Sequence, residues 1–155
     1  MDILFQEFGT LILFTHILSA VIWVGGMIAI RFAVHPAIQT IDPAVRLEKS
    51  LMVMRNLFNL VALFTLLIVM TGIIMVVALD IGKVMEVHIK EGIWSIMIIN
   101  FIFMYIRRAK AQLLLENGDV EGAKKIAHLI SSKMLPVNLV LGVVAIFFGV
   151  MLRGF

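Results

Sequence analysis

The sequence contains no cysteine among its 155 residues. A disulfide framework, a thiolate zinc site, an iron–sulfur cluster and a cysteine nucleophile are therefore excluded. The absence of cysteine does not by itself identify the cellular compartment.

Charged residues are scarce. Asp, Glu, Lys and Arg make up 15% of the chain, whereas apolar residues make up 62% and the mean hydropathy is +1.10. An ordinary soluble domain is about half apolar and about a quarter charged. A water-soluble core of this size would leave too much apolar surface uncovered, whereas lipid is a suitable solvent for that surface. We therefore expect an integral membrane protein whose main partner is the lipid bilayer.

Four apolar runs are each roughly 18 to 23 residues long, close to the ~20 residues that a helix needs to cross ~30 Å of hydrocarbon. The sequence therefore predicts an all-α fold, an integral membrane four-helix bundle. Because no linker divides the chain, residues 1–155 are expected to form a single membrane domain. The predicted spans are 8–30, 57–79, 84–106 and 135–152, and amphipathic segments are expected at 44–55 and 119–133.

The basic residues are distributed unevenly. Ten of the thirteen lie in the two long connections, so the positive-inside rule places those connections in the cytoplasm and both termini outside. The net charge of +3 is compatible with nucleic-acid binding, but the basic residues flank apolar runs, and no nucleic-acid partner is expected. The ten are Arg31, Arg46, Lys49, Arg55, Arg107, Arg108, Lys110, Lys124, Lys125 and Lys133, and the other three are Lys83, Lys90 and Arg153.

Two histidines lie within the predicted spans. His16 is about two turns into the first span and His88 is near the start of the third. The first and third spans run in the same direction, so both histidines are expected in the outer leaflet, at depths that differ by ~6 Å. Two histidines facing each other at similar depth in a four-helix bundle are what axial ligation of haem requires. His16 and His88 are therefore predicted as metal ligands, with haem b as the cofactor.

Small and aromatic residues accompany these histidines. Trp23 lies seven residues after His16, and Gly92 lies four residues after His88, so each shares a helical face with its histidine. Faces with small residues leave room for a flat macrocycle, and Trp23 and Gly92 are predicted as cofactor-binding residues. The alternative is that the histidines form hydrogen bonds between helices and that the small residues allow close helix packing.

Lys90 is a further ionisable residue within a span, where such groups are expensive and are candidates for function. It lies two residues after His88, which turns it ~200° around the helix from that histidine. Lys90 and Arg31 are predicted in a catalytic role, binding a carboxylate or managing protons. The alternative for Lys90 is an anchor that snorkels to the membrane surface.

Other polar and sulfur-containing residues have weaker implications. His35 and His128 are left without an assigned role. Asn59, Asn100 and Asn138 are expected to form hydrogen bonds between helices. The eleven methionines are compatible with a copper site, because thioethers suit Cu(I), and equally with ordinary packing in an apolar protein.

Several short motifs, spread over almost the whole chain, carry a family resemblance. A histidine precedes a tryptophan by seven residues and Gly25-Gly26 follows, an arginine lies four residues before a histidine–proline pair, and a histidine-x-lysine opens the third span. These motifs resemble those of the CopD and HemJ families of four-helix membrane proteins. The residues concerned are His16, Trp23, Arg31, His35-Pro36, His88, Lys90 and Leu135-Pro-Val-Asn138, while Met70-Thr71-Gly72 is closer to CopD.

The resemblance implies a haem b protein linked to protoporphyrinogen IX oxidation, as in HemJ, or to copper handling, as in CopD. We expect an oxidoreductase of a bacterial inner membrane whose substrate is a porphyrinogen or a quinone-like lipid-soluble donor. The alternatives are a copper transport or copper-resistance protein and a membrane scaffold without redox chemistry. Both a monomer and a homo-oligomer are compatible with the sequence.

Overall fold

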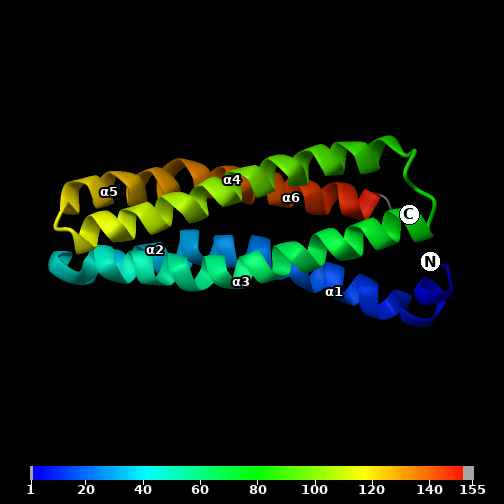
Figure 1. Ribbon diagram of the computed structural model, residues 1–155, viewed down its shortest axis with the longest axis horizontal. Coiled ribbons are helices and arrows are strands. Elements are labelled where there is room, and N and C mark those ends of the chain that lie inside the picture. The colour runs from blue at the N-terminus through cyan, green and yellow to red at the C-terminus, as the bar shows by residue number, and fades with distance from the viewer. Residues whose placement is uncertain (1, 152–155) are drawn as a thin grey trace.

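The computed structural model describes residues 2–151, and the predicted all-α fold is confirmed, with no strand in this part of the chain. The end of the fourth predicted span at residue 152 and Arg153 lie outside the described residues. The elements in chain order are α1 (Asp2–Ala29), η1 (Ile30–Val34), α2 (His35–Gln39), α3 (Pro43–Ala78), α4 (Met85–Glu116), α5 (Val120–Leu129), η2 (Ile130–Met134) and α6 (Leu135–Met151), where η1 and η2 are π-helical (Figure 1).

The elements form four long rods: α1-η1-α2, α3, α4 and α5-η2-α6. All four are long and apolar enough to cross a membrane, because each holds an apolar stretch of 18 residues within a helix of 35, 36, 32 or 32 residues. A membrane crossing needs only ~20 residues, so each rod continues beyond the hydrocarbon. The amphipathic segments expected at 44–55 and 119–133 are helical, and they are continuous with the second and fourth spans in α3 and in α5-η2-α6. The bundle itself therefore extends past the membrane.

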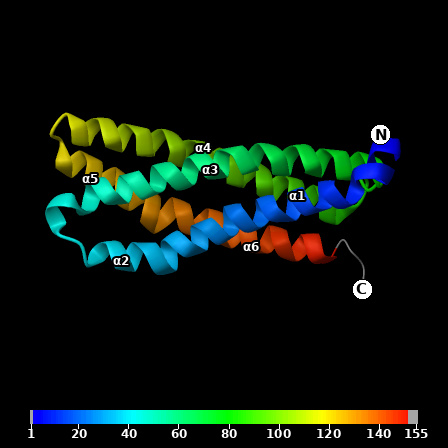
Figure 2. The same ribbon diagram turned by 90° about the horizontal axis from the view of Figure 1, so that it is seen from below.

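The rods pack in a ring. α1 lies against α3, α3 against α4, α4 against α6, and α6 against α1. Consequently α1 and α4 face each other diagonally across the bundle axis. Figures 1 and 2 show α1, the end of α6 and the turn between α3 and α4 at one end, and α2 and α5 at the other. An even number of spans places the two ends of the described chain on the same side.

Both π-helical segments have the same cause in the sequence. Pro36 and Pro136 each lie two residues after the last residue of a π-helical segment, η1 and η2 respectively. A proline inside a helix has no N–H to donate, and its ring clashes with the carbonyl four residues earlier. The backbone widens to the π-helical spacing before each proline, and the rods continue without a break.

Side-chain capping fixes where α3 and α5 begin. The Asp42 carboxylate accepts a hydrogen bond from the Ala44 amide at 2.9 Å, and Pro43 occupies the first position of α3. Asp119 caps α5 in the same way, accepting from the Gly122 amide at 2.8 Å. Gly118, at φ +83°, reverses the chain between α4 and α5 in a conformation that favours glycine.

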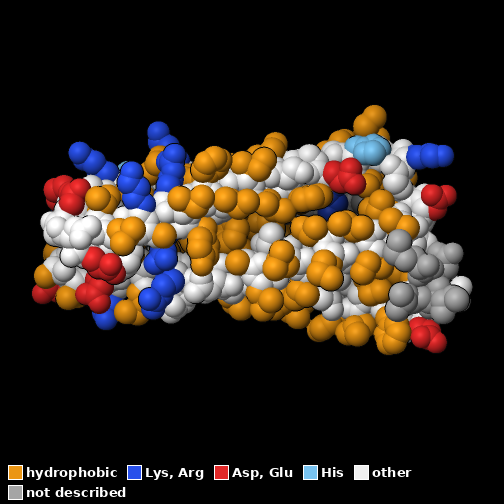
Figure 3. All heavy atoms as spheres, viewed as in Figure 1, with side chains coloured by type: hydrophobic (Ala, Val, Ile, Leu, Met, Phe, Trp, Pro, Cys, Tyr) orange, Lys and Arg blue, Asp and Glu red, His pale blue; other side chains and the backbone are white. Residues whose placement is uncertain are grey.

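The core is aromatic and methionine-rich at mid-height. Trp23 packs on Phe101 with ring centroids 5.8 Å apart, and Phe58 packs edge-on against Phe101 at 5.6 Å, so side chains of α1, α3 and α4 meet on the axis. Around this core the outward surface is also apolar. Figure 3 shows hydrophobic side chains over most of the visible face, with most Lys and Arg side chains at the end that holds α2 and α5. This surface is that of an integral membrane protein.

The expectation for the asparagines is confirmed. Asn100 of α4 donates to the Asn138 side chain of α6 at 2.7 Å and to the Met134 carbonyl at 2.8 Å, and Asn138 donates to the Met97 carbonyl at 3.0 Å. Asn59 of α3 accepts from the Tyr105 hydroxyl of α4 at 2.8 Å. These bonds link α6 and α3 to α4.

Candidate functional site

His16 of α1 is hydrogen-bonded to a hydroxyl of α3. Its Nδ1 lies 3.0 Å from the Thr71 oxygen, and the Thr71 hydroxyl donates to the Leu67 carbonyl at 2.7 Å. A hydroxyl has one proton, so Thr71 accepts from His16, and the hydrogen-bond network assigns the imidazole proton to Nδ1. Nε2 then carries the lone pair, which makes it the nitrogen available as a metal ligand.

Gly72 leaves room for the His16 imidazole to lie against α3. A Cβ at that position would lie 3.4 Å from Cε1 of His16, so the imidazole packs directly over the glycine backbone. The Thr71-Gly72 pair therefore supplies both the hydrogen-bond partner and the space for the ring, which is half-buried between the two helices.

Lys90 faces the bundle interior from α4. A Cβ at Gly149 of α6 would lie 3.1 Å from the Lys90 Nζ, so the ammonium packs against α6. In the described part of the chain, Lys90 has neither a hydrogen bond nor an ion pair. Gly72 is six residues before the end of α3 and Lys90 is five residues after the start of α4, so their depths agree to within a few ångströms.

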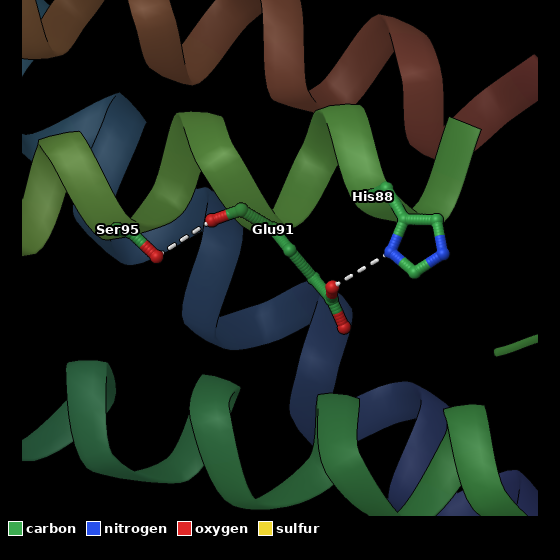
Figure 4. A network of polar contacts seen from close by, with 3 residues as sticks. All are labelled: His88, Glu91 and Ser95. Atoms are coloured by element: carbon green, nitrogen blue, oxygen red, sulfur yellow. Dashed lines mark hydrogen bonds and ion pairs between the residues drawn. The ribbon is translucent and has the colours of Figure 1, made fainter. Parts of the chain in front are cut away.

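The His88 side chain lies on a different side of α4 from Lys90. Its side chain is 57% exposed and its Nδ1 lies 3.3 Å from a carboxylate oxygen of Glu91, one helical turn later. Figure 4 shows His88, Glu91 and Ser95 on the side of α4 turned away from α6 and toward the ribbons of α1 and α3, with the Ser95 hydroxyl donating to the Glu91 carbonyl. Since His88 and Lys90 are ~200° apart around the helix, only one of them can face the interior, and that one is Lys90.

The structure therefore places His16 and Lys90 at similar depth on α1 and α4, and His88 points to a different side of α4 from Lys90. The two histidines lie on diagonally opposite helices, and their described hydrogen bonds are to Thr71 and Glu91 respectively. Ligation of one haem by both histidines stays a prediction.

The other predicted site residues are dispersed. Trp23 is 2% exposed in the core, and its indole nitrogen has no hydrogen-bond partner in the described residues. Gly92 is exposed, with open space where a Cβ would project. Arg31 is exposed in η1, about 22 Å along the helix axis from His16, at the basic end of the bundle. Arg31 and Lys90 do not form one site.

His16, Lys90 and the residues packed against them, Thr71, Gly72 and Gly149, form what we call the interior cluster, and the last three were not predicted as site residues. Thr71 orients His16, Gly72 leaves space for its ring, and Gly149 makes room for Lys90. The available signal was weak, since it consisted of a threonine–glycine pair in one apolar run and a glycine in another. Neither shows from sequence alone which helix it will contact.

The chemistry of the interior cluster can be compared with the needs of haem. His16 offers an oriented, neutral imidazole with Nε2 available, and Lys90 offers a cation without a counter-ion for a carboxylate. These two residues fit one axial ligand and one propionate partner, respectively. In the described residues no group of three or more His, Asp or Glu side chains is arranged to hold a metal ion. Comparisons with protein-family models, curated proteins and solved structures give no match.

Proposed function

We propose that this integral membrane protein binds a carboxylate-bearing tetrapyrrole at the interior cluster and acts as a haem b oxidoreductase. The observation that carries the proposal is that an oriented imidazole, His16, and an ammonium packed against Gly149, Lys90, lie at similar depth, and that Lys90 has no partner in the described residues. An unpaired cation inside a membrane protein is costly, and an anionic ligand would offset that cost.

His16 would hold the iron through Nε2, and the Thr71 hydroxyl would keep the ring in place. Hydrogen bonds to the second nitrogen of a ligating histidine fix its tautomer and orientation. Bound haem would supply one-electron redox chemistry inside the bilayer. Lys90 would bind a carboxylate, either a propionate of the cofactor or a carboxylate of a porphyrinogen substrate. The resemblance to HemJ supports protoporphyrinogen IX as that substrate.

We also propose an orientation, with the basic end in the cytoplasm and both termini outside a bacterial inner membrane. Its support is the basic asymmetry, since Figure 3 shows most Lys and Arg side chains at the end with α2 and α5. The interior cluster would then lie in the outer leaflet, near the turn between α3 and α4.

The test is the visible spectrum and metal content of protein purified in mild detergent. A Soret band with iron at about one atom per chain supports the proposal, and His16→Ala should remove most of the haem. His128→Ala, a change at an exposed histidine at the other end of the bundle, is the control and should retain it. Stoichiometric copper without iron would overturn the haem assignment in favour of copper handling.

The same preparation tests His88. If His88→Ala loses as much haem as His16→Ala, α4 must rotate to bring His88 inward when the cofactor binds. If it retains the haem, His16 is the imidazole ligand and His88 belongs to the half-exposed pair with Glu91.

A further inference from the structure

A second polar cluster lies at the basic end, far from the interior cluster. A cavity of about 360 Å³ opens between α2, the first turns of α3 and the α5-η2 segment. No Asp or Glu lines it within the described part of the chain. Its lining includes two cations, two imidazoles and two hydroxyls, from Arg46, Lys124, His35, His128, Ser50 and Ser131. This composition is that of an anion site.

Arg46 is positioned by neutral partners. Its Nη2 and Nε donate to the Ile41 carbonyl at 2.9 and 3.3 Å, and its Nη1 donates to the Gln39 side-chain oxygen at 3.4 Å. These bonds fix the guanidinium at the cavity without neutralising its charge. The side chain is thus held ready for an anion, and the entropy cost of ordering it is already met by folding.

Lys124 has only a weak competing partner. It donates to Glu121 at 2.8 Å, but the two side chains are 54% and 75% exposed. Exposed ion pairs of this kind contribute little to stability, so Lys124 can exchange Glu121 for a ligand at small cost.

A buried arginine adds to the positive charge of this region. Arg108 is 9% exposed, its Nε has no hydrogen-bond partner, and it forms no ion pair in the described residues. It lies on the buried stripe of α4, one turn before Ala111, which packs in one core cluster with Ala127. Ala127 also lines the cavity. Arg108 itself does not line the cavity, but its charge adds to the positive charge at this end of the bundle.

We propose that this cavity binds a phosphate group. A phosphate presents several acceptor oxygens, which match a guanidinium, an ammonium, imidazoles and hydroxyls converging from three elements. The cavity lies at the end of the bundle where the apolar surface is replaced by charged side chains. The phosphate group can therefore come from two sources. One is the headgroup of an anionic phospholipid, and the other is a soluble phosphate compound.

The test uses full-length protein, the double variant Lys124→Gln/His128→Gln and the control Lys125→Gln. Lys125 is the next residue of α5, is exposed, and does not line the cavity. One arm titrates inorganic phosphate into delipidated protein in non-ionic detergent, with sulfate for comparison. In the other arm the protein is reconstituted in phosphatidylcholine nanodiscs, either with or without added phosphatidic acid. The protein is then extracted again, and the phosphatidic acid that stays bound to it is measured.

We expect the double variant to raise the dissociation constant of its ligand roughly tenfold or more, equivalent to at least about 1.4 kcal/mol, and the control to stay within about twofold of the parent. Binding of inorganic phosphate would identify a soluble ligand, and retention of phosphatidic acid alone would identify a lipid headgroup. The proposal is overturned if the parent binds neither probe, or if the double variant binds as tightly as Lys125→Gln.

Discussion

The imidazole of His16 and the hydroxyl of Thr71 form a 3.0 Å hydrogen bond that joins α1 to α3. Because Thr71 donates its only proton to the Leu67 carbonyl, this bond dictates which imidazole nitrogen carries a proton. Thr71 on α3 therefore determines which nitrogen of His16, on α1, carries the lone pair. The bond makes Thr71 the positioning residue of the interior cluster.

Thr71→Val keeps the shape of the side chain and removes the acceptor. We expect the variant to bind haem about 10- to 100-fold more weakly than the parent, the range typical of lost partners of ligating histidines. Thr65→Val is the matched control, since Thr65 is also buried in α3 but bonds only to the Val61 carbonyl of its own helix. Haem titration followed at the Soret band measures both. Equal affinities would show that Thr71 does not orient the ligand.

Asn138 should make a measurable contribution to stability. It is fully buried, and Asn138→Leu would break its bond to Asn100 and its bond to the Met97 carbonyl. We expect the free energy of unfolding in detergent to fall by about 1–2 kcal/mol. Asn59→Leu, at an exposed asparagine whose partner is Tyr105, should cost less. A larger loss for Asn59 would contradict this ranking of the interhelical bonds.

Orientation can be tested cleanly because the chain has no cysteine. A cysteine at Gly82, in the turn between α3 and α4, should react with an impermeant thiol reagent added to whole cells. A cysteine at Asn117, between α4 and α5, should react only after permeabilisation. Asn117 is the better site in that turn, since Gly118 has a positive φ that other residues rarely adopt. Reversed labelling would place the basic end outside.

The four spans were predictable, because apolar runs of membrane-spanning length leave few alternatives to helices. The extension of the bundle beyond the membrane was missed, although Asp42-Pro43 is a clear helix start whose helix then runs without interruption into the second span. The residues of the predicted amphipathic segment 44–55 are part of this helix, and they pack against the neighbouring rods.

The site could be predicted only in part. The helical repeat fixes the ~200° angle between His88 and Lys90, but not which of them faces inward. In a helix of a soluble protein, the apolar face identifies the side that points inward. Here both the interior side and the lipid-facing side of the helix are apolar, so hydrophobicity does not distinguish them. One deciding residue is on another helix, because Gly149 of α6 leaves space for Lys90. The other is on α4 itself, where Glu91 pairs with His88 one helical turn earlier.

Lys90 provides the sharpest test of the proposed function. Lys90→Met keeps much of the volume of the side chain and removes the interior charge, so we expect it to fold, to retain part of its haem through His16, and to lose most turnover of a porphyrinogen. Lys90→Arg should retain part of that turnover, because the cation survives beside Gly149.

Lys83→Met, in the exposed turn before α4, is the control and should match the parent. Turnover by detergent-solubilised protein and haem content per chain are the two measurements. If Lys90→Met equals the parent in both, Lys90 is only an interfacial anchor, and the carboxylate site is lost from the proposal while His16 ligation stands.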